Sequence, residues 1–93
     1  MPQDYQEAVK WMTLASEQGN PQAQHNMAYL YYNGQGVKID KFYAHMWASI
    51  ASSNGFENAK GLLEALDKEM TPSQIEEAEK LARECVKKNY KGC

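Results

Sequence analysis

Residues 31–47, "YYNGQGVKIDKFYAHMW", contain a glycine-rich turn, a histidine and a cluster of aromatic side chains. A phosphate-binding loop would have to follow a strand and open a helix with further glycines. Gly34-Gln35-Gly36 instead follows a segment whose apolar residues have helical spacing. We therefore interpret Gly34 as the end of one helix, and the rest of the turn as a loop that places Val37 between helices.

The tryptophan that ends this stretch belongs to an internal repeat. Trp11 precedes Trp47 by 36 residues, and five further pairs of residues share that spacing. They are Asp4 and Asp40, Ala8 and Ala44, Ala15 and Ala51, Gly19 and Gly55, and Ala23 and Ala59. A period of this length fits one pair of helices with its two turns, which is the unit of an α-solenoid.

Local signals predict where the helices begin and end. In both copies of the repeat, the apolar residues stand at i, i+3, i+4 and i+7, which predicts an amphipathic helix. Asp4 with Glu7 is typical of a capping box, and Asp40 is typical of an N-cap. Between these two helices, Asn20-Pro21 predicts the start of another helix, which Gly34 ends.

The C-terminal part departs from the repeat. Residues 57–70 keep the helical spacing but lack the glycine turn. Thr71 and Gln74 then predict a capping box, with Pro72 at the first position of a fifth helix. The apolar face of that helix comprises Ile75, Ala78, Leu81, Ala82, Cys85 and Val86. Charged residues cover the rest of it, which suits the end of a solenoid.

Residues 23–40, together with Ala44, Trp47 and Ala51, closely resemble the Sel-one-like repeat (SLR) family, a relative of the tetratricopeptide repeat. The family pattern is roughly A-x-x-x-L-G-x-x-Y-x-x-G-x-G-V-x-x-D-x-x-x-A-x-x-W-x-x-x-A. Met27 replaces the usual leucine and Ala28 the usual glycine. The resemblance implies an all-α fold, a right-handed superhelix of about five antiparallel helices that ends in a capping helix.

We accordingly interpret residues 1–93 as a single solenoid segment. Residues 4–19 would be the second helix of a truncated repeat, and residues 20–55 one full repeat. Residues 56–70 would be the first helix of a degenerate repeat, and residues 71–93 the capping helix with its tail. The expected repeat core comprises Ala8, Trp11, Ala15, Ala23, Met27, Ala28, Tyr31, Gly34, Gly36, Val37, Ala44, Trp47, Ala51, Ala59 and Leu63.

The resemblance also implies a function. SLR proteins usually act as protein-binding scaffolds, in bacterial envelope, secretion or signalling proteins and in eukaryotic complexes, and not as enzymes. The first helices of successive repeats line a concave groove that binds a protein or peptide partner. Carried over residue by residue, this groove comprises Gln22, His25, Tyr29, Tyr32, Asn33, Asn58, Gly61, Ala65 and Lys68.

Several alternatives stay open at this point. The same residues could form a solvated helix face, and the segment could be a purely architectural end cap or dimerisation segment of a longer scaffold. A binder of a small cell-wall-type ligand is a further alternative. The N-terminal repeat lacks its first helix, so we expect the chain to be a piece of a longer protein, with homodimerisation through the open N-terminal face as the rival interpretation.

Composition argues against other functions. Lysine and arginine total 10 against 12 aspartates and glutamates, for a net charge of −2, so no nucleic-acid partner is expected. No apolar run approaches the ~20 residues of a membrane span, so no membrane insertion is expected. No motif for nucleophilic catalysis occurs, and we expect no catalytic residues and no cofactor. His25 and His45 lack the partners of a metal motif, and His45 is expected on a half-exposed outer face.

The two cysteines give information about the cellular location of the protein. Cys85 lies on the apolar face of the last predicted helix, and Cys93 ends a short tail. If the helix stops near Lys88, Gly92 lets the tail fold back and the two sulfurs can meet. We expect a disulfide there, and stable disulfides belong to oxidising compartments. An exported or periplasmic location is therefore favoured if the disulfide forms, and a cytoplasmic one otherwise.

Overall fold

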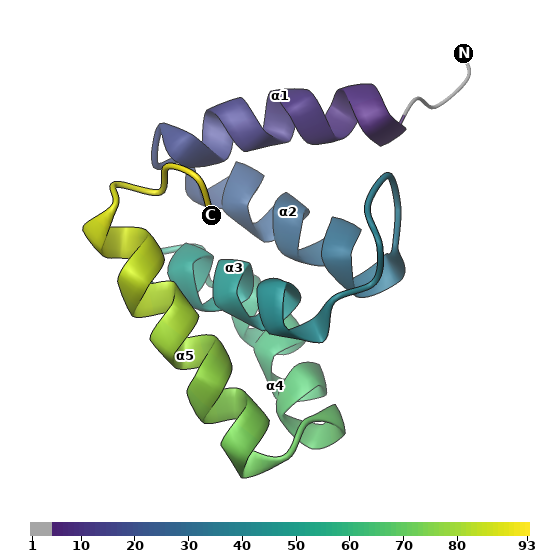
Figure 1. The fold of residues 1–93 in the computed structure, drawn as a ribbon, viewed down its shortest axis with the longest axis vertical. Helices are drawn as coiled ribbons and strands as arrows, with labels where there is room; N and C mark the ends of the chain where they lie inside the picture. Colours follow the sequence, from purple (N-terminus) through teal and green to yellow (C-terminus); the bar gives the residue numbers. More distant parts are fainter. Residues whose placement is uncertain (1–4) are drawn as a thin grey trace.

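The computed structural model describes residues 5–93, which form five α-helices joined by short turns (Figure 1). The helices are α1 (Tyr5–Glu17), α2 (Pro21–Asn33), α3 (Lys41–Ser53), α4 (Ala59–Glu69) and α5 (Pro72–Lys87). No strand occurs among residues 5–93. The prediction of an all-α solenoid is confirmed. The capping box predicted at Asp4 lies outside the described residues.

Side-chain caps fix the starts of three helices. The Asn20 side chain accepts a hydrogen bond from the backbone N–H of Ala23 (3.0 Å), and Pro21 occupies the first turn of α2. Asp40 accepts one from the N–H of Tyr43 (3.1 Å) at the start of α3. The capping box at the start of α5 is present, with both of its reciprocal hydrogen bonds. Each cap satisfies a backbone donor that has no partner within its helix.

The glycine-rich turn is a joint between α2 and α3. Gly34 has a left-handed backbone (φ 71°), and its N–H donates to the carbonyl of Leu30 at 2.8 Å. Gly36 is also left-handed (φ 81°), and a Cβ there would lie 2.7 Å from the carbonyl oxygen of Tyr5. The loop therefore lies against the start of α1, at a distance that only glycine permits.

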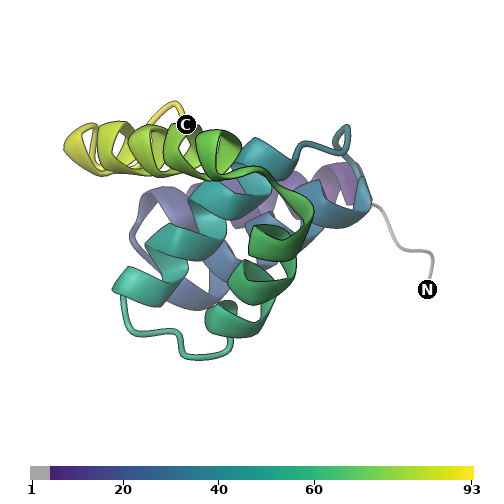
Figure 2. The ribbon, with the colours of Figure 1, turned by 90° about the horizontal axis from the view of Figure 1, so that it is seen from below.

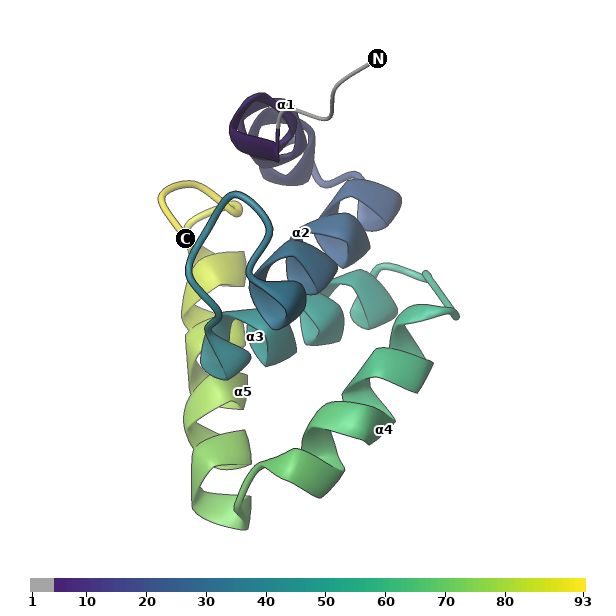
Figure 3. The ribbon, with the colours of Figure 1, turned by 90° about the vertical axis from the view of Figure 1, so that its right-hand side faces the viewer.

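The core is centred on α3, which packs against α2, α4 and α5. Figure 2 shows α5 lying across α3, and Figure 3 shows α4 and α5 diverging from their shared turn on either side of it. Ala44, Ala48 and Ala51 are fully buried along α3, which lets neighbouring backbones approach closely. Trp47, only 2% exposed, and Ile50 fill the space between the helices.

Most of the expected repeat core lies inside the structure. The fully buried members are Ala23, Met27, Ala28, Ala44, Trp47, Ala51 and Ala59. The half-buried members are Ala8, Ala15, Tyr31, Gly34, Val37 and Leu63, whereas Gly36 is exposed in the turn between α2 and α3.

Trp11 departs from that expectation, because its side chain is 64% exposed. Its repeat equivalent Trp47 is enclosed by helices on several sides, whereas α1 packs chiefly on α2. The opposite face of α1 is open, and Leu14 is exposed there as well. Repeat position alone therefore does not bury a tryptophan, because burial needs the helix that covers it.

A disulfide closes the C-terminal tail. The sulfur atoms of Cys85 and Cys93 lie 1.95 Å apart, as expected from the sequence. Asn89 and Tyr90 both have left-handed backbones (φ 55° and 64°), which turn the chain back after α5. The tail thereby brings the Tyr90 ring against Gly19, in the turn between α1 and α2.

A chain of polar contacts joins this tail to three helices. The Asn54 side-chain amide lies 3.2 Å from the Tyr90 hydroxyl and donates to the Gln24 side chain at 2.9 Å. Gln24 is fully buried and donates onward to the carbonyl of Ser16 at 3.1 Å. Because a buried amide costs free energy unless it is paired, these contacts fix the relative positions of the turns at this end.

The two tryptophans give a matched test of the fold. We expect Trp47→Ala to lower the free energy of unfolding by about 3–5 kcal/mol, because it leaves a large cavity in the core. Trp11→Ala should change it by less than about 1 kcal/mol, since Trp11 is mostly exposed. Urea unfolding followed by circular dichroism measures both. Equal losses for the two variants would contradict the described packing.

The disulfide gives a second test. Reducing the Cys85–Cys93 bond should lower the free energy of unfolding by roughly 2–3 kcal/mol, because it releases a short closed loop in the unfolded chain. Urea unfolding with and without dithiothreitol measures the effect. Cys93→Ser should show the lower stability under both conditions, which separates loss of the bond from any other action of the reductant. If dithiothreitol does not change the urea midpoint of the wild-type chain, the assignment of a Cys85–Cys93 disulfide is wrong.

Candidate protein-binding surface

The helices α2 and α4 are the first helices of successive helical pairs, and side chains of α2 contact α4 at one end and the turn before α4 at the other. At one end His25 of α2 contacts Phe56, which lies in the turn before α4. At the other end the Tyr32 hydroxyl donates to the Glu69 carboxylate at 2.5 Å. We call the groove residues expected from the sequence that are exposed or half-exposed in the structure the α2–α4 surface. It comprises Gln22, Tyr29, Tyr32, Asn33, Asn58, Gly61, Ala65 and Lys68.

An aromatic cluster supports the exposed tyrosine of this surface. The rings of His25 and Tyr29 meet edge-on, with centroids 4.9 Å apart. The ring of Phe56 lies 4.8 Å from His25, tilted by 40°. His25 is therefore only 9% exposed and lies within the cluster, whereas the sequence predicted it as a groove residue. Tyr29 remains 42% exposed.

Glu69 links α4 to α2 and α3 at the other end of the surface. Besides accepting from Tyr32, its carboxylate lies 2.9 Å from the ammonium of Lys41 at the start of α3. The pKa of Glu69 is lowered mainly by the hydrogen bond from Tyr32 and, to a smaller extent, by the contact with Lys41. The same hydrogen bond raises the pKa of Tyr32. Three helices are thus joined at one carboxylate, although the group is solvated and its individual contacts are weak.

A buried histidine lies behind this surface. His45 is 2% exposed, and its Nε2 lies 2.9 Å from the Asp67 carboxylate of α4. Its Nδ1 lies 3.4 Å from the Ser49 hydroxyl. The expectation of a half-exposed His45 was therefore wrong, because α4 covers that side of α3 and provides a polar partner there.

The sequence reasoning missed three residues that shape the surface. Phe56, Asp67 and Glu69 each contact a residue that lies 22 or more positions away in the chain. No local pattern marks them, because their partners are defined by the packing of α4. Gly55, which ends the preceding helical repeat, was the only nearby signal for Phe56.

The surface combines aromatic and polar side chains. Within residues 5–93, no group of three or more histidine, cysteine, aspartate or glutamate side chains could hold a metal ion. The helices that the structure describes include none that is long and apolar enough to cross a membrane. What the surface offers is an aromatic ring and a half-buried phenol, surrounded by amides and one ammonium group.

The buried His25 predicts a pH dependence of stability. Burial lowers the pKa of His25 below its ordinary value of 6.5. The imidazole therefore binds a proton less readily in the folded chain than in the unfolded chain. The free energy of unfolding should therefore fall as the pH drops below about 6.5, until the folded pKa is passed. His25→Phe, which keeps a ring in the cluster, should remove this part of the decline, as measured by urea unfolding at several pH values.

His45→Gln serves as the control. It leaves His25 in place and should therefore keep the part of the pH dependence of unfolding that comes from His25. Identical pH dependence in the wild type and in His25→Phe would contradict the prediction.

Comparison with known proteins agrees with this architecture. The Sel1 repeat family matches residues 1–20 and 21–56. The chain is also similar to chitin synthase regulatory factor 3 of Schizosaccharomyces pombe, with 33% identity over 88 residues. That alignment covers 92% of this chain but only 9% of the length of the relative. Sel1 repeats are generally non-catalytic helical scaffolds for protein interactions. The resemblance seen in the sequence is confirmed, and the chain belongs to the Sel1 repeat family.

Proposed function

We propose that this chain is a protein-interaction module that binds a peptide or protein segment on the α2–α4 surface, without catalysing a reaction. The observation that carries the proposal is Tyr29, a large side chain that is 42% exposed yet held by an edge-on contact with the buried ring of His25. An exposed ring that is already ordered loses little conformational freedom on binding.

Tyrosine is well suited to such a role. Its ring buries a large apolar area, and its hydroxyl pairs with polar groups of a partner, so tyrosine is enriched among the residues that dominate binding energy. Tyr32 lies one turn away on α2 and is half buried, with its hydroxyl on Glu69. We expect Tyr29 to contribute most of the affinity and Tyr32 to contribute chiefly to the shape of the surface.

Polar residues surround this aromatic centre. Gln22 and Asn33 are exposed on the same face of α2 as Tyr29, at spacings of seven and four residues. Asn58, the N-cap residue of α4, and Lys68 on α4 are also exposed. Amide groups can donate and accept hydrogen bonds along a peptide backbone, and an apolar centre with a polar rim is the usual anatomy of a protein interface.

The relative from fission yeast is consistent with an adaptor role, since its name describes a regulatory factor. Because the chain matches only 9% of that protein, we do not extend the proposal to chitin synthase. The partner is defined instead by its chemistry, as a segment that covers Tyr29 and pairs with the surrounding amides.

A second candidate function rests on the open face of α1. Trp11 and Leu14 are both exposed there, as apolar side chains with no covering helix among the described residues. Exposed apolar patches mark association surfaces, so this face suits contact with another part of a longer scaffold or with a second copy of the chain. Light scattering over a concentration series tests the second copy, and a monomer throughout would exclude it.

The proposed function predicts a specific loss of binding. Peptides selected from a random library against the wild-type chain should bind Tyr29→Ala at least about tenfold more weakly, because a hot-spot residue contributes 2 kcal/mol or more. Tyr5→Ala is the matched control, since Tyr5 is similarly exposed but lies on α1. Fluorescence anisotropy measures the affinities, and circular dichroism verifies that both variants keep their helices.

The proposal fails if the selected peptides bind Tyr29→Ala as tightly as the wild type. It also fails if Tyr5→Ala loses as much affinity as Tyr29→Ala, because the binding surface would then not be specific to α2 and α4.

A further inference from the structure

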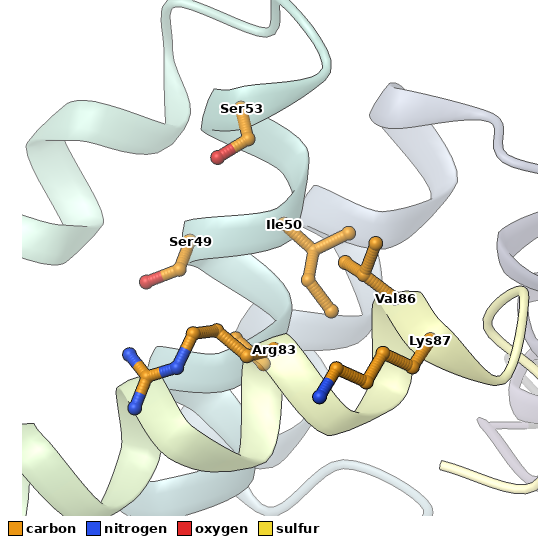
Figure 4. Close-up of a pocket in the computed structure, with 7 residues that line it drawn as sticks. Ser49, Ile50, Ser53, Arg83, Val86 and Lys87 are labelled. Carbon is orange, nitrogen blue, oxygen red and sulfur yellow. The ribbon is translucent and has the colours of Figure 1, made fainter.

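A hollow lies between α3 and α5, and it shares no residue with the α2–α4 surface. It encloses a volume of about 360 Å³. Its lining residues are Ser49, Ile50, Ser53, Ala82, Arg83, Val86 and Lys87 (Figure 4). The hollow extends for a little more than one turn along each helix, from Ser49 to Ser53 on α3 and from Ala82 to Lys87 on α5.

The floor of the hollow is apolar. Ile50 and Ala82 are almost completely buried and form its base. Figure 4 shows Ile50 of α3 and Val86 of α5 pointing toward each other across it. Val86 is 48% exposed, although the sequence places it on the apolar face of α5. A β-branched apolar side chain left half exposed beside a hollow gains stability when another apolar group covers it.

The rim of the hollow on α5 is cationic. Arg83 and Lys87 lie one helical turn apart on α5 and are both exposed, and Figure 4 shows their side chains extending in the same direction along this helix. Neither forms an ion pair within residues 5–93. This local pair of positive charges stands out in a chain whose net charge is −2. The hydroxyls of Ser49 and Ser53 line the opposite side of the hollow.

We propose that this hollow is a second binding site, for a peptide segment that inserts one bulky apolar side chain between carboxylates. The apolar side chain would cover Val86 and contact Ile50, while flanking aspartate or glutamate residues pair with Arg83 and Lys87. Charge complementarity selects this occupant, because carboxylates neutralise two cations that have no ion pair within residues 5–93. A groove between two helices also matches the way that amphipathic segments dock onto helical proteins.

The site would act independently of the α2–α4 surface. It is formed by α3 and α5, the second helices of their pairs, whereas Tyr29 lies on α2. One module could thus hold two segments at once, and linking two weak contacts raises the overall affinity without any new contact.

The test uses a capped synthetic peptide, Glu-Glu-Ser-Phe-Glu-Glu, titrated into the ¹⁵N-labelled full chain. We expect the largest amide shifts at residues of the hollow, including Ile50 and Val86. Arg83→Glu/Lys87→Glu should weaken binding about tenfold, because it replaces two weak attractions by repulsions. Lys80→Glu/Lys88→Glu is the matched control, since it makes the same charge change on and just after α5 without altering the hollow and should change the affinity by less than about twofold.

Two altered peptides separate the contribution of the carboxylates from that of the apolar side chain. Replacing the four glutamates by glutamine should weaken binding to the wild type, and replacing the phenylalanine by serine should abolish it. No shift at the hollow up to millimolar peptide, or equal weakening by both charge-reversed variants, would overturn the site. Loss of binding in Tyr29→Ala, with no effect of Arg83→Glu/Lys87→Glu, would place the peptide on the α2–α4 surface; this outcome overturns the second site and leaves the proposed function standing.

Discussion

The whole fold depends on how closely other helices can approach α3. Three alanines along this helix are fully buried and present only methyl groups to their neighbours. Their small size brings the backbones of adjacent helices close together, and Trp47 and Ile50 then fill the remaining space. A larger residue at Ala44, Ala48 or Ala51 would push a neighbouring helix away from α3. It would thereby change the α2–α4 surface or the hollow between α3 and α5.

Both candidate binding surfaces follow from this arrangement. The α2–α4 surface exists because α2 and α4 meet through Phe56 and Glu69 while they pack on α3. The hollow exists because α5 crosses α3 and leaves Val86 half covered. One central helix therefore fixes two surfaces of different chemistry, one aromatic with amides around it and one apolar with a cationic rim. A scaffold protein needs this kind of rigidity, because preordered side chains bind at a lower entropic cost.

Polar contacts make the packing specific. His45 pairs with Asp67 behind α4, and Gln24 connects the turns at the end where the tail docks. A buried amide or imidazole is stable only in an arrangement that provides its partner, so such contacts disfavour alternative packings of the same helices. The disulfide between Cys85 and Cys93 adds to this effect by holding Tyr90 close to Asn54.

The sequence by itself determined the helices, three of their N-caps, the glycine joint and the repeat, because these depend on residues within a few positions of one another or on a fixed period. Asn20, Asp40 and Thr71 cap the helices as their local patterns predict. Only the tertiary structure decided which apolar residues are covered. Trp11 and Trp47 occupy the same repeat position, yet one is exposed and the other buried, since burial depends on which other helices pack against that position. The partners of His25, His45 and Tyr32 were likewise decided by packing, because no local pattern encodes a contact between side chains of different helices.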